Sequence, residues 1–323
     1  MMSQSNFAKL LLESGYLPDL ELHSSDRPKQ FWAGFKLHST DRIEQLWVYH
    51  RRLALWKPID DSRLQKIFYN VTTKYIKCHQ ETEAFRGFST AHFVREACFA
   101  LHSMIRSDIP FNSQMDLIPL ADQFVFNLKT KELSPRSHYH RFTYSLPVIY
   151  DADADPTEIE KFLGEILPDE EDRNLLRQIL FECLGNRLPK ERIYFWGQCS
   201  AGVSTLFRLI SATLGPFVIH DRFGRSGHLV AMDEERHRND SISREHVRMV
   251  LVDGDEPEKK LPPTVFQLVR SYSSHSVEEI GIEFTARFSR EPAGKERESD
   301  PLMSEKICDQ KNRNAFLNWI LKN

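Results

Sequence analysis

The sequence predicts an α/β protein, in which a C-terminal domain with a central parallel sheet follows a mainly helical domain with short strands. Two apolar runs predict the sheet: residues 193–197 end in a glycine-punctuated turn before a helix, and residues 249–252 end in acids. Apolar residues at helical spacing between residues 60 and 105 predict the preceding domain. We expect three parts: a polar, partly mobile segment at 1–45, the small helical domain at 46–150 and the sheet domain at 151–323.

The composition is typical of a soluble protein with a real core, since 41% of the 323 residues are hydrophobic and 28% are charged. No run approaches the ~20 apolar residues of a membrane helix, and no secretory signal is visible. Five scattered cysteines without a C-x-x-C pair favour a reducing, intracellular setting without structural metal. The net charge of −3 does not indicate nucleic acid, so any DNA surface has to be local.

The helical domain is predicted to begin with a hairpin in which residues 46–49 pair with residues 53–56. A helix follows from Asp60 or Asp61 to about Cys78, and a second helix spans residues 90–105. Outside its apolar stripe the first helix carries a row of cations: Arg63, Lys66, Lys74 and Lys77. This row is suited to a DNA phosphate backbone. The alternative is a solvated helix face without a ligand.

Residues 118–133 are predicted to form two short strands, and residues 134–147 a linker rich in aromatic and basic side chains. Gln123 and Phe124 occupy the turn between the strands, where an Asn-Gly pair would make a tight turn, so this turn has to be built differently. In the linker, His138 and His140 have the spacing of a metal pair. No third ligand is close in the sequence, and we expect no metal there.

Helices are predicted at residues 156–167, 169–184 and 204–214, and a last helix ends at residues 316–321. Asp169 is a good N-cap followed by acidic residues, and Gly185 and Gly215 close two of these helices. The apolar stripe of the 169–184 helix packs in the core or against another subunit. The charged residues 221–244 are expected to form a loop or short helices.

The turn after residue 197 has the layout of a phosphate-binding loop, G-x-x-x-x-G-K-[ST], with one substitution. Gly197, Gly202, Ser204 and Thr205 fit the pattern, and Val203 stands where lysine belongs. Such a loop points backbone N–H groups at phosphate oxygens at a helix N-terminus, and its Ser/Thr hydroxyl, here Ser204, holds Mg²⁺. Valine supplies neither charge nor a hydrogen bond. The alternative is a plain strand–turn–helix connection.

The order of several motifs resembles the phage, plasmid and poxvirus-type primase-helicase family over about residues 45–323. These are residues 129–135, 146–155 and 162–172, followed by the loop. The resemblance implies a superfamily 3 helicase domain of the P-loop, AAA+-like fold, preceded by a small helical domain. It also implies ATP and Mg²⁺ as cofactors. In this chain the helicase-like domain is expected to be shortened at its C-terminal end.

The acidic stretch after residue 252 is predicted to be the Walker B element that this resemblance implies. Its candidate carboxylates are Asp253, Asp255 and Glu256, which would organise Mg²⁺ and position the attacking water. Residues 266–270 follow it, as the family's helix with a basic residue would. Residues 229–235 are a rival for the same role, and an edge strand with a surface acidic turn is the alternative.

The sequence departs from the family's pattern at two further features. The γ-phosphate sensor, an asparagine after a strand, is replaced by Ser289, which follows the strand expected at residues 284–288. The paired-arginine segment that supplies a finger to a neighbouring subunit is shortened. Its nearest substitutes are Arg287, Arg290, Lys295 and Arg297. One arginine finger is worth about 10³- to 10⁵-fold in rate, so these losses predict little hydrolysis.

The resemblance implies an ATP-dependent DNA helicase for replication of a viral, phage or plasmid genome, here with a degenerate nucleotide site and weak or no ATPase on its own. The alternative is a non-catalytic DNA-binding or ring-interaction subunit that regulates an active homologue. Expected partners are single-stranded or forked DNA, further copies or an active homologue in a ring, and a separate primase. No membrane partner is expected, and the site of action is the cytoplasm or nucleus of a host.

Overall fold

The computed structural model describes residues 31–35, 44–50, 52–59, 106–107, 111–185, 193–197, 200–223, 229–231, 248–253, 266–271 and 281–322, with single positions at 62, 65, 66, 69, 92 and 96. By its contacts the chain forms two compact units. The N-terminal unit comprises residues 1–113 and 136–144, and the C-terminal unit comprises residues 114–135 and 145–323. This division differs from the expected boundary near residue 150.

A four-stranded sheet organises the N-terminal unit, in the order β3-β2-β1-β4. Its strands are β1 (Phe31–Phe35), β2 (Glu44–His50), β3 (Leu55–Ile59) and β4 (Arg106–Ser107). β2 pairs antiparallel with β3, which confirms the predicted hairpin. The positions described within the two predicted helices, 62, 65, 66, 69, 92 and 96, are helical, and the rest of both helices lies outside the described residues.

Trp56 in β3 is the centre of this unit's described core, because its side chain is fully buried. Its indole nitrogen donates to the carbonyl of His138 at 3.0 Å, and its backbone N–H donates to the carbonyl of Phe142 at 2.8 Å. Residues 136–144, expected to be a linker, are thus packed onto the hairpin. They include the 3₁₀ helix η2 (His138–His140), because buried aromatic side chains hold this segment in place.

A three-stranded antiparallel sheet opens the C-terminal unit: β5 (Leu117–Pro119), β6 (Phe124–Asn127) and β7 (Leu133–Pro135). Gln123 adopts a positive φ of 67°, which closes the β5–β6 turn without an Asn-Gly pair. The predicted pair of strands is confirmed, and a third strand takes up the start of the expected linker. The N–H of Leu146 donates to Pro119 at 2.8 Å, so residues from 145 onward belong with this sheet.

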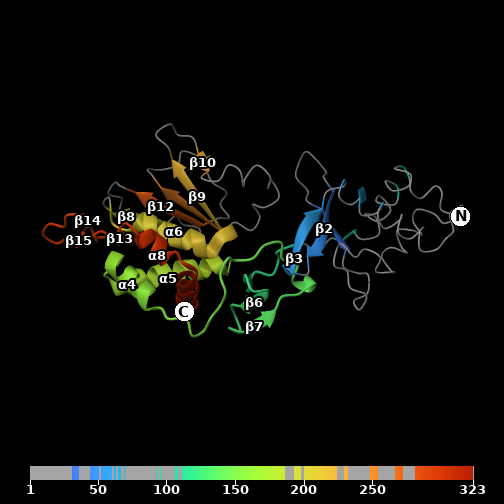
Figure 1. Ribbon diagram of the computed structural model, residues 1–323, viewed down its shortest axis with the longest axis horizontal. Helices are drawn as coiled ribbons and strands as arrows, with labels where there is room; N and C mark the ends of the chain where they lie inside the picture. The colour runs from blue at the N-terminus through green and yellow to red at the C-terminus, as the bar shows by residue number, and fades with distance from the viewer. Residues whose placement is uncertain are drawn as a thin grey trace, which may run out of the picture. The chain divides into compact units, whose positions relative to one another are not determined.

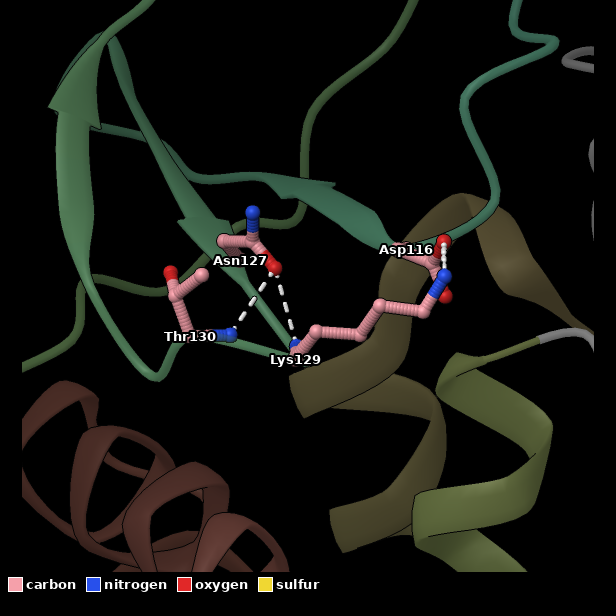
Figure 2. Close-up of polar contacts among 4 residues, drawn as sticks. All are labelled: Asp116, Asn127, Lys129 and Thr130. Carbon is pink, nitrogen blue, oxygen red and sulfur yellow. Dashed lines mark hydrogen bonds and ion pairs between the residues drawn. The ribbon is translucent and has the colours of Figure 1, made fainter.

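The turn between β6 and β7 is held by the side chain of Asn127 (Figure 2). Its Oδ1 accepts from the backbone N–H groups of Lys129 at 2.8 Å and of Thr130 at 3.2 Å. The ammonium of Lys129 reaches Asp116 at 2.6 Å. Lys129 is largely exposed and Asp116 is partly exposed, so this ion pair adds little stability. The asparagine sets the turn's geometry.

The main sheet of the C-terminal unit has six strands in the order β10-β9-β11-β12-β8-β13. They are β8 (Ile193–Gly197), β9 (Val218–Phe223), β10 (Leu229–Ala231), β11 (Met249–Asp253), β12 (Phe266–Ser271) and β13 (Gly281–Phe284). All neighbours pair parallel except β10, which lies antiparallel at one edge. The α/β class is therefore confirmed.

Two local predictions around this sheet are wrong. Residues 266–271 form the parallel strand β12 where a helix with a basic residue was expected, because Leu268 and Val269 pair with strands on both sides. The strand expected at residues 284–288 divides into two: β13 ends at Phe284, and β14 (Phe288–Ser289) pairs with β15 (Arg297–Glu298). Short apolar runs do not separate these cases by periodicity alone.

The described helices of the C-terminal unit gather along one side of the main sheet (Figure 1). They are α4 (Thr157–Ile166), α5 (Glu170–Leu184), α6 (Val203–Leu214), the short η3 (Gly215–Phe217), α8 (Met303–Ile307) and α9 (Gln310–Leu321). The predicted helices are confirmed to within a residue or two. Asp169 caps α5 by accepting from the N–H of Glu171 at 2.9 Å, and Gly215 ends α6.

The apolar stripe of α5 lies in the core and not on an exposed face. Its five buried residues are Leu176, Ile179, Leu180, Cys183 and Leu184. Helix α9 packs against α5 and α6 with Phe316 and Ile320 fully buried. The guanidinium of Arg177 lies 4.6 Å from the ring centre of Trp319, which joins α5 to α9 at the rim of this core.

Candidate functional site

The candidate phosphate-binding loop connects the end of β8 to the start of α6. Gln198 and Cys199 lie outside the described residues. Ser200 and Gly202 both have positive φ, 65° and 90°, so the chain turns sharply before Val203 begins the helix. Glycine adopts such angles without strain. The local geometry is that of a strand, a tight loop and a helix whose first N–H groups face the loop.

Two segments brace this loop. A Cβ added to Gly202 would overlap the Cγ2 atom of Ile166, which is fully buried near the end of α4. The backbone N–H of Phe288 in β14 donates to the carbonyl of Ser200 at 3.1 Å. The loop conformation is therefore fixed by contacts with segments far away in the sequence.

Val203, the position of the missing lysine, is fully buried at the first turn of α6. Ser204 and Thr205 follow it and are partly exposed. Valine contributes apolar packing at a position where lysine would place a charge on the phosphates. The structure thus keeps the loop and the hydroxyls and has a core residue in place of the cation.

The sheet places the end of β11 at the same edge as the loop. Cα partners run from Asp253 to Arg270 in β12, and from Ser271 in β12 to Trp196 in β8, directly before Gly197. The three parallel strands therefore end side by side. Two strand spacings separate β8 from β11, about 9–10 Å. The backbone of Asp253 thus lies at the same edge of the sheet as the loop.

Asp255 and Glu256, the other predicted carboxylates, lie outside the described residues. So do the acidic residues 233–235 of the rival stretch. The strand that leads to the rival, β10, runs antiparallel to β9 and therefore ends at the opposite edge of the sheet from the loop. The sheet direction favours the β11 stretch, although the roles of its carboxylates stay predictions.

Ser289 lies in β14, outside the main sheet and directly after the residue that bonds the loop. Its hydroxyl donates to the carbonyl of Glu291 at 3.2 Å. In the main sheet it is β12 that lies between β8 and β11. The end of β12 therefore has the more central place for a group that senses a bound phosphate. Because residues 266–270 were expected to form a helix, sequence reasoning missed this position.

The substitutes for the arginine finger divide into two kinds. Arg287 pairs with Glu296 at 3.0 Å, and Arg297 donates to the carbonyl of Glu165 near the end of α4 at 2.7 Å. These contacts tie the parallel pair of strands β14 and β15 together and to α4. Arg290 and Lys295 lie in the exposed connection between the two strands. A structural role therefore accounts for two of the four cations.

Of the four cations predicted to bind DNA, Lys66 is exposed at a helical position. Arg63, Lys74 and Lys77 lie outside the described residues. Within the described part of the chain, no group of three or more His, Cys, Asp or Glu side chains is arranged to hold a metal ion. None of the described helices has the length and apolar character needed to cross a membrane.

His140 belongs to the packed turn. Its Nδ1 accepts a hydrogen bond from the backbone N–H of Ser137 at 2.9 Å. Burial lowers the pKa of His140 below its ordinary value of 6.5, and the charges of Arg136 and His138 lower it further. A proton on Nδ1 would also replace this acceptor by a donor, so the fold favours the neutral ring.

Stability of the N-terminal unit is expected to fall in acid because of His140. The folded pKa lies below the unfolded value of 6.5, so the unfolded chain binds more protons and stability is lost as pH falls through the folded pKa. Chemical denaturation at pH 7 and at steps below 6.5 measures this loss. His140→Gln keeps an acceptor without a proton to bind, and should flatten the pH dependence. An unchanged profile in that variant would contradict the assignment.

Comparison with known proteins agrees with the motif order. Residues 34–168 match the family model described as D5 N terminal like, which stands for the N-terminal domain of primase-helicases. This part of the chain is therefore similar to primase-helicases, in agreement with the order of its motifs. No curated protein matches the chain.

Two solved structures of the NrS-1 C terminal region, both described as apo, are similar to the chain at low identity. The first has 9% sequence identity and a TM-score of 0.48, covering 96% of this chain and 70% of that one. The second, described as the A form, has 9% identity and a TM-score of 0.49, with 96% and 69% covered.

Proposed function

We propose that this chain is a DNA-replication protein whose C-terminal unit is a superfamily 3 helicase-type, AAA+-like domain with a disarmed nucleotide site. The observation that supports this most is the shared edge of the main sheet. The loop after β8 and Asp253 at the end of β11 lie on either side of β12. This arrangement suits a nucleoside triphosphate, because backbone N–H groups at a helix N-terminus and a nearby carboxylate serve the phosphates and their Mg²⁺.

The residues present fit ATP and Mg²⁺ only in part. The first turn of α6 supplies N–H groups for phosphate oxygens, and the hydroxyl of Ser204 and the carboxylate of Asp253 are the ligand types that Mg²⁺ prefers. When bound, Mg²⁺ would neutralise phosphate charge. Val203 provides no cation for the β- and γ-phosphates, so one class of contact is lost.

The size of that loss sets the expected activity. A hydrogen bond to a charged group contributes about 1.5–3 kcal/mol, so losing the lysine weakens nucleotide binding by about 10- to 100-fold. Loss of an arginine finger would lower the rate by a further factor of about 10³–10⁵. The protein is therefore expected to bind ATP weakly and to hydrolyse it little, if at all, without a partner subunit.

Replacing Val203 by lysine tests the nucleotide half of this proposal. Val203→Lys should bind a fluorescent ATP analogue about 10- to 100-fold more tightly than the matched control Val203→Met, which has similar bulk without charge. Fluorescence titration with Mg²⁺ measures both, beside the unaltered chain. If all three proteins fold, as circular dichroism would show, and none binds the analogue, the nucleotide site is contradicted.

Hydrolysis provides a separate measurement. DNA-stimulated ATP hydrolysis by the unaltered chain, abolished in Glu256→Ala, would contradict a disarmed motor and would establish an active one. A background rate equal in both proteins is the expected result.

A second function is favoured by the buried Val203 and by Arg287 and Arg297, whose contacts are within the chain. A subunit that binds DNA or joins a ring of active homologues has no need of its own hydrolysis. A gel shift with forked DNA in the absence of nucleotide, and co-sedimentation with an active homologue, test this function. If the chain binds neither forked DNA nor an active homologue, this second function is contradicted. A separate primase chain and an intracellular host setting belong to the same proposal.

A further inference from the structure

The packed turn at residues 137–141 presents the most exposed large aromatic side chain of the described residues. The side chain of Tyr139 is 74% exposed, although aromatic rings normally lie inside. Its inner neighbour is the imidazole of His138, with ring centres 3.9 Å apart and planes inclined by 37°. Tyr139 therefore has a second ring close behind it.

The position of this pair is fixed by the fold beneath it. The carbonyl of His138 accepts from the Trp56 indole at 3.0 Å and from the N–H of Arg141 at 3.2 Å. The ring of His138 also lies edge-on to Tyr49 in β2, with centres 5.8 Å apart. A side chain exposed on such a rigid base loses little conformational entropy when a flat ligand stacks on it.

The charge around the turn is positive. Within the described residues 44–50, 52–59 and 136–144, which make up the β2–β3 hairpin and the segment packed on it, the one acidic residue is Glu44 at the start of β2, whereas the whole chain carries a net charge of −3. Their lysines and arginines are Arg52 and Lys57, which are exposed, and Arg136 and Arg141, which are buried. The guanidinium of Arg136 joins the two segments by donating to the carbonyl of Leu53 at 2.6 Å. An exposed aromatic ring together with these basic side chains attracts a ligand that is a polyanion and also carries flat rings.

We propose that Tyr139, backed by His138, is a stacking platform for an unpaired base of single-stranded nucleic acid. An exposed aromatic ring beside a local positive surface is the combination that binds single strands without reading sequence, because every base has a flat face and every nucleotide a phosphate. This site deepens the DNA-binding part of the proposed function. It is separate from the helix row that includes Lys66, and it requires no nucleotide.

Fluorescence anisotropy of a labelled thymidine oligonucleotide, at low salt and without ATP, tests the platform. Tyr139→Ala should weaken binding about 5- to 100-fold, the range that alanine substitution gives for a stacked base. Tyr139→Phe keeps the ring and should bind within about twofold of the unaltered chain. Tyr139→Leu keeps apolar bulk without a π-face and should resemble the alanine variant. Thermal melts should agree among all four proteins, because the side chain is exposed.

A duplex of the same sequence is the control for charge alone. Its bases are already stacked, so Tyr139→Ala and the unaltered chain should bind the duplex equally. The same dependence on Tyr139 with a uridine oligomer would support the platform and add RNA as a source of the base. Equal single-strand affinity for the alanine variant and the unaltered chain, or no single-strand binding at low salt, would overturn the proposal. Both outcomes are independent of the Val203 experiments.

Discussion

Gly202→Ala is expected to lower the free energy of unfolding of the C-terminal unit by about 3 kcal/mol. Two costs add. A φ of 90° is strained for alanine, at about 1–3 kcal/mol. The new methyl group also overlaps Ile166, and overpacking of a fixed core costs about 1–3 kcal/mol more. For a unit of this size, the melting temperature should fall by roughly 6–12 °C, which calorimetry measures.

Gly294→Ala is the matched control for this substitution. Gly294 also has a positive φ, 65°, but a Cβ added there has nothing within 4 Å. It therefore carries the backbone strain without the overlap, and a loss of only about 1 kcal/mol is expected. If the two variants lose the same free energy of unfolding, Ile166 does not press on the loop. The inference that α4 braces the loop is then wrong.

Arg248→Met is expected to destabilise the C-terminal unit by about 1.5–3 kcal/mol, the range for losing a hydrogen bond from a charged group. Arg248 is only 3% exposed. Its guanidinium donates to the carbonyl of Leu184 at the end of α5 and lies 3.9 Å from the ring centre of Phe217. A cation there also interacts favourably with the negative, C-terminal end of the α5 dipole. Methionine fills the space but leaves the carbonyl without this donor.

Cys183 in α5 supplies a local readout for the Arg248 variant. Burial raises the pKa of its thiol to about 12, and Arg248 opposes that rise. The thiol should therefore resist alkylation until this region opens. Removing Arg248 would by itself make the thiol less acidic, so faster labelling in Arg248→Met can only report opening. Arg248→Lys, which keeps the charge without the planar fork, should lose less stability. If the Cys183 thiol of Arg248→Met is alkylated at the same rate as in the unaltered chain, the stabilising role of Arg248 is contradicted.

Much of the local structure could be predicted because its cause is local. The Asp169 cap, the apolar stripe of α5 and the glycine after α6 all lie within a few residues of the helix ends that they determine. The β2–β3 hairpin follows from alternation over a short stretch. The loop after β8 was recognisable because its glycines and hydroxyls have a fixed spacing.

The predictions that were wrong concern segments whose structure is determined by residues far away in the sequence. Residues 266–271 form β12 because strands lie on both sides of them, and nothing within that short apolar run distinguishes a strand from a buried helical turn. The β12 position between the loop and Asp253 was missed as a result. Residues 134–147, rich in aromatic and basic side chains, were expected to be a linker because the anchor of residues 136–144, Trp56, lies about 80 residues earlier in the chain.

The sequence by itself determined the resemblance to primase-helicases, the phosphate-loop layout and the substitution of Val203, since these are properties of residue types at fixed spacing. Only the tertiary structure decided that Val203 is buried, that Ile166 and Phe288 brace the loop, and that Arg287 and Arg297 make contacts within the chain. It alone also placed the exposed Tyr139 on a turn that is anchored to the β2–β3 hairpin through Trp56. The physical reason is that burial and charge depend on which distant segments meet, and long-range packing decides this.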